Sequence, residues 1–241
     1  SDVMGQLVRL RADSLAFPPI TNALDDPPGL LAVGGDLRPE RLLAAYRQGI
    51  FPWYDDSSPI LWWSPDPRMV LPPARVHVSR SLRKLIRKNL YTVSMDQAFN
   101  QVICHCADLR LDREGTWITN AMQQAYFELH HQGHAHSVEI WQDSELVGGL
   151  YGVSIGRMFF GESMFSLRPD VSKLAFVALA RQLQGWSFEL IDCQLPTSHL
   201  ASLGAQPISR DEFRKLLAGN ATQKSRPGPW EYEPDSMNIS A

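Results

Sequence analysis

The chain has 241 residues, of which 44% are hydrophobic, and its formal net charge is −3 at pH 7, so we expect a globular protein with a substantial core and exclude one that coats nucleic acid. No apolar run reaches the about 18 to 20 residues that span a bilayer, and the first residues lack the order of a secretion signal. Three cysteines favour a reducing compartment, and we expect a cytoplasmic protein that is not bound to a membrane.

The first third of the chain is rich in Pro, Gly and Trp and has few strand-like runs, which indicates loops around short helices. One helix is clear at residues 41–48, and Gly49 is suited to end it. Trp53, Trp62 and Trp63 follow within eleven positions. These rings form either a small aromatic core or a surface on which a base stacks, a contact worth about 1 to 3 kcal/mol per base.

From about Met69 onward the pattern changes to alternating strands and helices, which predicts a small domain at residues 1–69 and a larger one at 70–241. Antiparallel strands followed by a helix and a further strand indicate an α+β fold, with mixed α and β elements. The periodicity predicts helices over residues 79–88, 96–106, 119–131, 172–184 and 211–218, and strands over 135–142, 145–153, 157–161 and 190–194.

The predicted helix at 79–88 carries five cations and no acid. Like charges three and four positions apart repel, so this arrangement is destabilising unless an anion lies against it. A phosphate backbone would supply that anion, and a solvated basic face is the structural alternative. Phosphate contacts would dock one region of nucleic acid on one face without reading its sequence. The cations are Arg80, Arg83, Lys84, Arg87 and Lys88.

The predicted strand at 190–194 carries polar groups that strands seldom contain. Because side chains two apart point the same way, Asp192 and Gln194 share one face and Cys193 points to the other. A buried carboxylate costs several kcal/mol unless it is hydrogen-bonded. The acid and the amide therefore form either an internal hydrogen-bond network or a reaction centre.

A further carboxylate, Glu162, follows the predicted strand at 157–161. Functional groups are common at strand ends and in the adjoining loops. An amine substrate, or an amine held next to an ester, would need a hydrogen-bond acceptor of this kind. We therefore count Glu162 among the candidate site residues.

Other kinds of chemistry are disfavoured by the spacing of the residues that they need. Cys104 and Cys106 are too close together for a structural zinc site, although a cluster of four histidines follows at 130, 131, 134 and 136. No Gly-x-Ser-x-Gly elbow is present to carry a nucleophile. The turn before the helix at 172–184 lacks a glycine after Gly161, which argues against a site for coenzyme A pyrophosphate. We expect no metal and no cofactor.

Nine segments occur in one fixed order that is typical of a known family. They are GLLAVGGDL at 29–37, GIFPW at 49–53, WWSPDPR at 62–68, GTWIT at 115–119, GHAHS at 133–137, VGG at 147–149, GESMFS at 161–166, IDCQ at 191–194 and ASLGA at 201–205. In these segments the chain resembles the bacterial leucyl/phenylalanyl-tRNA protein transferases. It departs from the family pattern at Thr197 and Ser198, where members often have Asn and Asp.

The resemblance implies a small N-terminal domain packed on a larger domain similar to GNAT acyltransferases and to the Fem peptidyltransferases. It implies transfer of Leu or Phe, and less often Met, from aminoacyl-tRNA to the α-amino group of a protein that begins with Arg or Lys. Such a transfer marks the acceptor for degradation by the bacterial N-degron route. Aminoacyl-tRNA and the acceptor protein are then the partners, and nothing in the sequence requires more than a monomer.

The resemblance also assigns roles to individual residues. Gln194 would accept a hydrogen bond from the attacking amine, with its carboxamide polarised and oriented by Asp192. The terminal adenosine would stack near Trp53 and Trp117, with Glu162 close to the aminoacyl group. An N-terminal amine has a pKa of about 7.7 to 8.0, so a useful fraction is neutral and no strong base is needed. Positioning of amine and ester would supply most of the rate, roughly 7 to 11 kcal/mol of the barrier.

An apolar pocket for the transferred side chain is implied as well. A hydrophobic pocket separates aliphatic neighbours by only about 1 to 3 kcal/mol per methylene, which is consistent with accepting Leu, Phe and Met together. Plain hydrophobic core is the alternative for these residues. The candidates are Leu150, Met164, Phe176, Leu179 and Leu183, of which the last three follow helical spacing.

Two other functions remain open from the sequence. A Fem-like ligase acting on a cell-wall precursor would use the same donor with a different acceptor. A non-catalytic tRNA-binding protein would use Asp192 and Gln194 for structure alone. Transfer from charged tRNA to a peptide that starts with Arg separates the family reaction from both.

Overall fold

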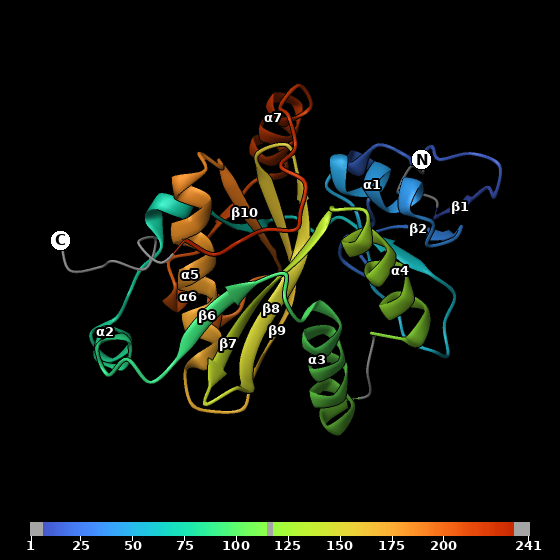
Figure 1. Ribbon diagram of the computed structural model, residues 1–241. Coiled ribbons are helices and arrows are strands. Elements are labelled where there is room, and N and C mark those ends of the chain that lie inside the picture. The colour runs from blue at the N-terminus through green and yellow to red at the C-terminus, as the bar shows by residue number, and fades with distance from the viewer. Residues whose placement is uncertain (1–6, 115–117, 234–241) are drawn as a thin grey trace.

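The computed structural model describes residues 7–114 and 118–233 (Figure 1). Within these ranges the chain forms a small sheet near the N-terminus and a large sheet that holds most of the remaining strands. None of the helices in these two ranges combines the length and the apolar character that crossing a membrane requires.

The N-terminal part contains a four-stranded sheet in the order β1-β2-β4-β3, so the expectation of loops with few strands was wrong. These strands are too short to give a periodic pattern, and two of them, β3 and β4, are formed by the aromatic segments, with Phe51 opposite Trp63 and Pro52 opposite Trp62. The bounds are β1 Val8–Leu10, β2 Leu30–Gly34, β3 Phe51–Pro52 and β4 Leu61–Trp63, together with helix α1 Pro39–Arg47 and the 3-10 turn η1 Ile20–Asn22.

The tryptophans of this part divide between core and surface. Trp62 is fully buried, and its Nε1 donates to the Gly34 carbonyl at 2.8 Å. Trp53 keeps 38% of its surface exposed and makes an edge contact with Trp63. The ring of Trp62 is therefore core, whereas that of Trp53 is partly exposed.

The large sheet has seven strands in the order β11-β5-β10-β9-β8-β7-β6. β10 runs parallel to β9, and the other neighbours are antiparallel. The predicted α+β class is confirmed by this mixed sheet. The bounds are β5 Arg68–Leu71, β6 Thr92–Met95, β7 Ala135–Gln142, β8 Glu145–Ile155, β9 Met158–Ser166, β10 Leu190–Gln194 and β11 Gln206–Ile208.

Helices cover both faces of the large sheet (Figure 1). α5 contributes its apolar side to one buried cluster, while α3, α4 and the N-terminal part enclose the other. Ser79 and Thr119 cap α2 and α4, because their hydroxyl oxygens accept the backbone N–H groups of Leu82 and Met122. The bounds are η2 Pro73–Arg75, α2 Arg80–Arg87, α3 Phe99–Glu114, α4 Asn120–His131, α5 Val171–Gly185, α6 Ser198–Ser202 and α7 Arg210–Asn220.

Two predicted elements have different limits in the structure. The helix expected over 96–106 begins at Phe99 and continues to Glu114. It begins late because Asp96 has a left-handed backbone with φ 56° and its carboxylate accepts the Ser137 N–H. The strand expected over 157–161 continues to Ser166, so Glu162 lies inside β9 and not beyond its end. The glycine at 161 suggested a strand end, whereas tertiary pairing with β8 continues past it.

Candidate active site

A cavity of about 680 Å³ lies where β9 and β10 separate. β10 pairs with β9 only from Leu190 to Asp192, opposite Met158 to Phe160. Beyond that point both strands line the cavity, together with β3 and α5. Separation of two neighbouring parallel strands thus opens a ligand-sized space inside the sheet.

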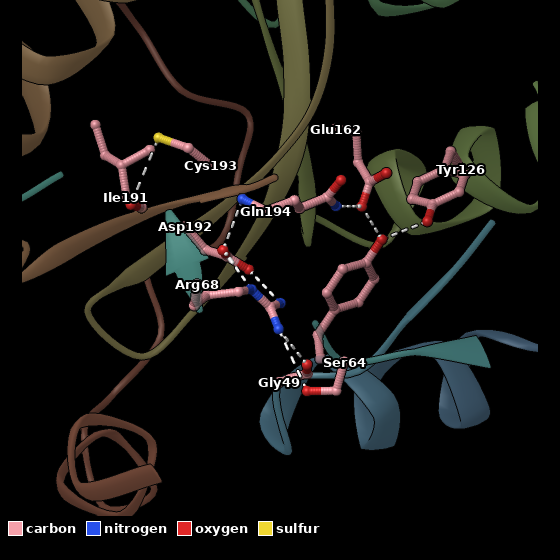
Figure 2. A network of polar contacts seen from close by, with 10 residues as sticks. Gly49, Ser64, Arg68, Tyr126, Glu162, Ile191, Asp192, Cys193 and Gln194 are labelled. Carbon is pink, nitrogen blue, oxygen red and sulfur yellow. Dashed lines mark hydrogen bonds and ion pairs between the residues drawn. The ribbon is translucent and has the colours of Figure 1, made fainter. Parts of the chain in front are cut away.

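Asp192 is fully buried beside the guanidinium of Arg68, which is itself 1% exposed. The two groups form a bidentate ion pair, with Nε to Oδ1 at 2.8 Å and Nη2 to Oδ2 at 2.7 Å (Figure 2). The remaining nitrogen of Arg68 donates to the Gly49 carbonyl at 2.9 Å and faces the Ser64 hydroxyl at 3.4 Å. Such complete pairing offsets the cost of burying both charges.

Gln194 has a left-handed backbone with φ 64°, which is uncommon for a residue other than glycine. Its backbone N–H donates to Asp192 Oδ1 at 2.9 Å. The register with β5 shifts between these two residues, so β10 ends in an irregular turn. Strained backbone of this kind costs about 1 to 3 kcal/mol and occurs most often where a side chain must be aimed.

The contact expected between Asp192 and the Gln194 carboxamide is not made, which corrects the predicted role of Asp192. The carboxylate holds the Gln194 backbone, while the carboxamide Nε2 donates to Glu162 Oε1 at 3.1 Å. The regular alternation of a strand would place both side chains on one face, but the left-handed residue breaks that alternation.

Glu162 is the extra residue of a β-bulge in β9, since Gly161 pairs with Gly152 and Ser163 pairs with Tyr151. A bulge redirects a side chain, and this one turns the carboxyl group toward the cavity and Gln194 (Figure 2). The bulge therefore brings together two groups that the sequence separates widely.

Two buried tyrosines complete this network. The Tyr46 hydroxyl, from α1, donates to Glu162 Oε1, and the Tyr126 hydroxyl, from α4, contacts the Tyr46 hydroxyl. Burial raises the pKa of both phenols well above their ordinary value, which keeps them protonated as donors. Burial also raises the pKa of Glu162 to about 8, against the opposing effect of the Tyr46 hydrogen bond. The carboxyl group is thus largely protonated at neutral pH.

The other predicted site residues lie in several places. Trp53 is at the cavity wall, as are four of the five apolar pocket candidates, Leu150, Met164, Phe176 and Leu179. Leu183 does not line the cavity and is fully buried in the core around α5. Leu183 shares the helical spacing of Phe176 and Leu179, but the cavity ends before the turn of α5 that carries Leu183. Trp117 lies outside the described residues.

The five cations of the basic segment, Arg80, Arg83, Lys84, Arg87 and Lys88, are all exposed on or directly after α2. Leu82 alone among the residues of α2 is fully buried, and it anchors the helix in the core beside α5. The basic face is therefore open to solvent and to any anionic partner.

Cys106, Cys193 and His199 are among the residues that line the cavity. In the ranges 7–114 and 118–233, no group of three or more His, Cys, Asp and Glu side chains is arranged to hold a metal ion. Burial raises the pKa of the Cys193 thiol, which disfavours a thiolate nucleophile. The cavity offers hydrogen-bonding groups and apolar walls instead.

Two family models match the chain. The model described as leucyl/phenylalanyl-tRNA protein transferase matches residues 70–218, and the model for the N-terminal domain of the same proteins matches residues 35–66. The chain belongs to this family.

Relatives in the family are similar over nearly their whole length. A leucyl/phenylalanyl-tRNA protein transferase of Pseudomonas fluorescens (strain SBW25) is 55% identical over 93% of this chain and 99% of its own. One of Stutzerimonas stutzeri (strain A1501) is 59% identical over 88% of this chain and 94% of its own. Among solved structures, L-PGS from Bacillus licheniformis matches 79% of this chain and 59% of its own, with 10% identity and a TM-score of 0.42.

Three residues of the network were missed in the sequence. Arg68 ends the family segment WWSPDPR but has no local feature that pairs it with an acid 124 positions away. Tyr46 lies within a helix that was predicted correctly, where an aromatic residue is ordinary core. Tyr126 lies in the predicted helix that forms α4, where an aromatic residue is likewise ordinary core. An arginine at the start of an apolar strand points to a buried ion pair only if it is buried, and the sequence alone does not show burial.

We predict that Asp192→Ala lowers the free energy of unfolding by about 3 to 5 kcal/mol, because Arg68 is left buried without its counterion. Urea denaturation measures this loss. Asp13→Ala, which breaks the exposed Arg11–Asp13 pair, serves as the control and should cost at most about 1 kcal/mol. Equal losses in the two variants would contradict the buried pair.

We predict a distinctive pH dependence for Glu162→Gln. The folded protein binds a proton at Glu162 up to a pKa of about 8, whereas an unfolded glutamate releases it near its ordinary value of 4.5. The wild type therefore loses stability as pH rises from 4.5 to 8, and the glutamine variant lacks this loss. Urea denaturation at pH 5 and pH 9 should show the variant gaining relative to wild type at the higher pH. Parallel pH profiles would rule out a protonated Glu162.

Proposed function

We propose that the protein transfers Leu or Phe, and less often Met, from aminoacyl-tRNA to the α-amino group of proteins that begin with Arg or Lys. The acceptor is thereby marked for N-degron degradation, and the enzyme acts as a cytoplasmic monomer without metal or cofactor. The observation that carries the proposal is the meeting of Gln194 and Glu162 in one cavity of a chain that belongs to this family.

The proposal includes a division into two domains at residues 69 and 70. It is supported by the separate family models for residues 35–66 and 70–218, while β5, at Arg68–Leu71, crosses this point as part of the large sheet. Arg68 would then connect the two sheets' surroundings, since it lies in the large sheet and donates to the carbonyl of Gly49, which follows α1 and precedes β3.

The reaction that we propose is the attack of a neutral amine on an ester. The amine nitrogen forms a bond to the ester carbonyl carbon, the bond from that carbon to the ribose oxygen breaks, and the amine proton passes to the departing oxygen. Since the Gln194 Nε2 is engaged by Glu162, its Oε1 is left to accept a hydrogen bond from the amine. A carboxamide is a very poor base, so Gln194 orients the amine and does not remove its proton.

In this proposal Glu162, and not Asp192, orients the carboxamide. Its Oε1 accepts hydrogen bonds from Gln194 and from Tyr46. Asp192 acts one step away by fixing the backbone from which the Gln194 side chain extends. The positions of amine and ester are thus set by hydrogen bonds, which suits a reaction whose ester is already activated.

The donor would occupy the same cavity. Its amino-acid side chain would contact Leu150, Met164, Phe176 and Leu179, and its adenine would stack on Trp53, whose ring is partly exposed at the cavity wall. Stacking by Trp117 stays a prediction from the resemblance. The acceptor-stem phosphates would lie on the basic face of α2, where contacts to phosphate alone suit tRNAs of unlike sequence.

The family match does not favour the Fem-like ligase, since the relatives carry the name of the protein transferase. The decisive assay offers the pure protein Phe-tRNA together with a peptide that starts with Arg, and follows labelled Phe in the peptide. Absence of transfer under these conditions would remove the proposal.

We predict that Gln194→Ala lowers the transfer rate roughly 10- to 100-fold, because the amine loses its orienting acceptor. Binding of charged tRNA, measured by filter retention, should be unchanged. Gln206→Ala, at an exposed position of β11, is the control and should transfer normally. A Gln194→Ala variant with wild-type rates would leave Asp192 and Gln194 with a purely structural role.

We predict that replacing both Arg83 and Arg87 by Ala weakens tRNA binding and reduces the slope of log affinity against log salt by roughly 1 to 2. The control is the pair Arg214→Ala and Lys215→Ala on the exposed side of α7. The control pair should leave the slope unchanged. The same slope in all three proteins would exclude a phosphate role for α2.

A further inference from the structure

Among the described residues, the second half of β9 pairs with one neighbouring strand only. Gly161 and residues Ser163 to Ser166 pair with β8, whereas the pairing with β10 ends at Phe160. The outer edge of this half lines the cavity. An edge of this kind presents backbone N–H and C=O groups that are ready to bond another extended chain.

The direction of these backbone groups follows from one hydrogen bond. The Leu167 N–H donates to the Val147 carbonyl on β8 at 2.7 Å. Backbone groups alternate in direction along an antiparallel strand, so Phe165 and Ser163 also face β8. Met164 and Ser166 consequently direct their N–H and C=O groups away from β8 and toward the cavity.

The second wall of the space is the end of β10. The last residue of β10 that pairs with β9 is Asp192, opposite Phe160. After it, Gln194, which has a left-handed backbone, turns the chain away from β9. The two diverging strands are bridged near their point of separation by the hydrogen bond from Gln194 to Glu162. The candidate reaction centre therefore lies at the narrow end of a slot whose long wall is the free edge of β9.

We propose that this slot receives the first residues of the acceptor polypeptide as a short strand parallel to β9. The inference rests on the proposed function and adds how the acceptor chain is held. Its α-amino group must reach Gln194 at the narrow end, and its chain must leave through the wide end. A chain that leaves from Glu162 toward Ser166 runs in the same direction as β9, which determines the parallel orientation.

Backbone pairing would explain how one enzyme serves many acceptors. Hydrogen bonds to main-chain groups are independent of sequence, so selection is confined to the terminal residue. At about 3.3 Å per residue, the edge from Glu162 to Ser166 is long enough for roughly four acceptor residues. The tRNA 3′ end is the less suitable occupant of the β9 edge itself, because a sugar-phosphate chain has no amide ladder to match it, and the donor would lie on the side of the cavity formed by Trp53 and α5.

The test uses a series of acceptor peptides that start with Arg, each with one peptide bond replaced by an ester, and wild-type enzyme with Phe-tRNA. An ester removes one N–H donor and preserves the shape of the chain. We expect kcat/KM to fall roughly two- to tenfold for alternate positions within the first four residues, and to stay unchanged for an ester after residue six. Equal rates for every peptide would overturn the proposal.

Hydrogen exchange identifies the strand that bonds the peptide. At saturating peptide, the backbone amides of Met164 and Ser166 should exchange more slowly, and those of Val8 and Arg9 in β1 should not change. Unchanged exchange at Met164 and Ser166 would also overturn the proposal. Failure of the proposed function gives a separate result, since the unmodified peptide would then receive no Phe at all.

Discussion

The buried ion pair between Arg68 and Asp192 is the interaction on which the rest of the site depends. Two charges without access to water are stable only if all their hydrogen-bonding groups are used. Arg68 meets this requirement by bonding Asp192 with two nitrogens and Gly49 with the third. One side chain thereby connects β5, β10 and the N-terminal part of the chain, and it fixes the strand that carries Gln194.

The geometry of the cavity follows from a second interaction of Asp192, the hydrogen bond that it accepts from the Gln194 backbone. While Oδ1 and Oδ2 bond the guanidinium, Oδ1 also accepts the backbone N–H of Gln194 and stabilises its left-handed conformation. That conformation ends the pairing of β10 with β9 and aims the carboxamide at Glu162. The same local feature thus opens the cavity and equips it with a polar group at its narrow end.

Glu162 brings the N-terminal part into the chemistry. A β-bulge turns its carboxyl group inward, and Tyr46 from α1 donates a hydrogen bond to it. Burial keeps this carboxyl group largely protonated at neutral pH, so no net negative charge is left opposite the Asp192–Arg68 pair. Hydrogen-bonding groups and apolar walls dominate the cavity. This suits a reaction between an ester and an amine, because the two groups must be positioned more than they must be activated.

Local sequence features determined much of this protein. Sequence periodicity predicted α2, α4, α5 and β10, and the acid and amide of β10 indicated the candidate site. Only the tertiary structure determined which of the polar side chains pair with one another. Arg68 and Asp192 are 124 positions apart, and Tyr46 and Glu162 are 116 apart, so neither pairing leaves a trace in the local pattern. The end of the cavity before Leu183 was likewise decided by packing, because residues on one helical face share a period whether they line a space or fill a core.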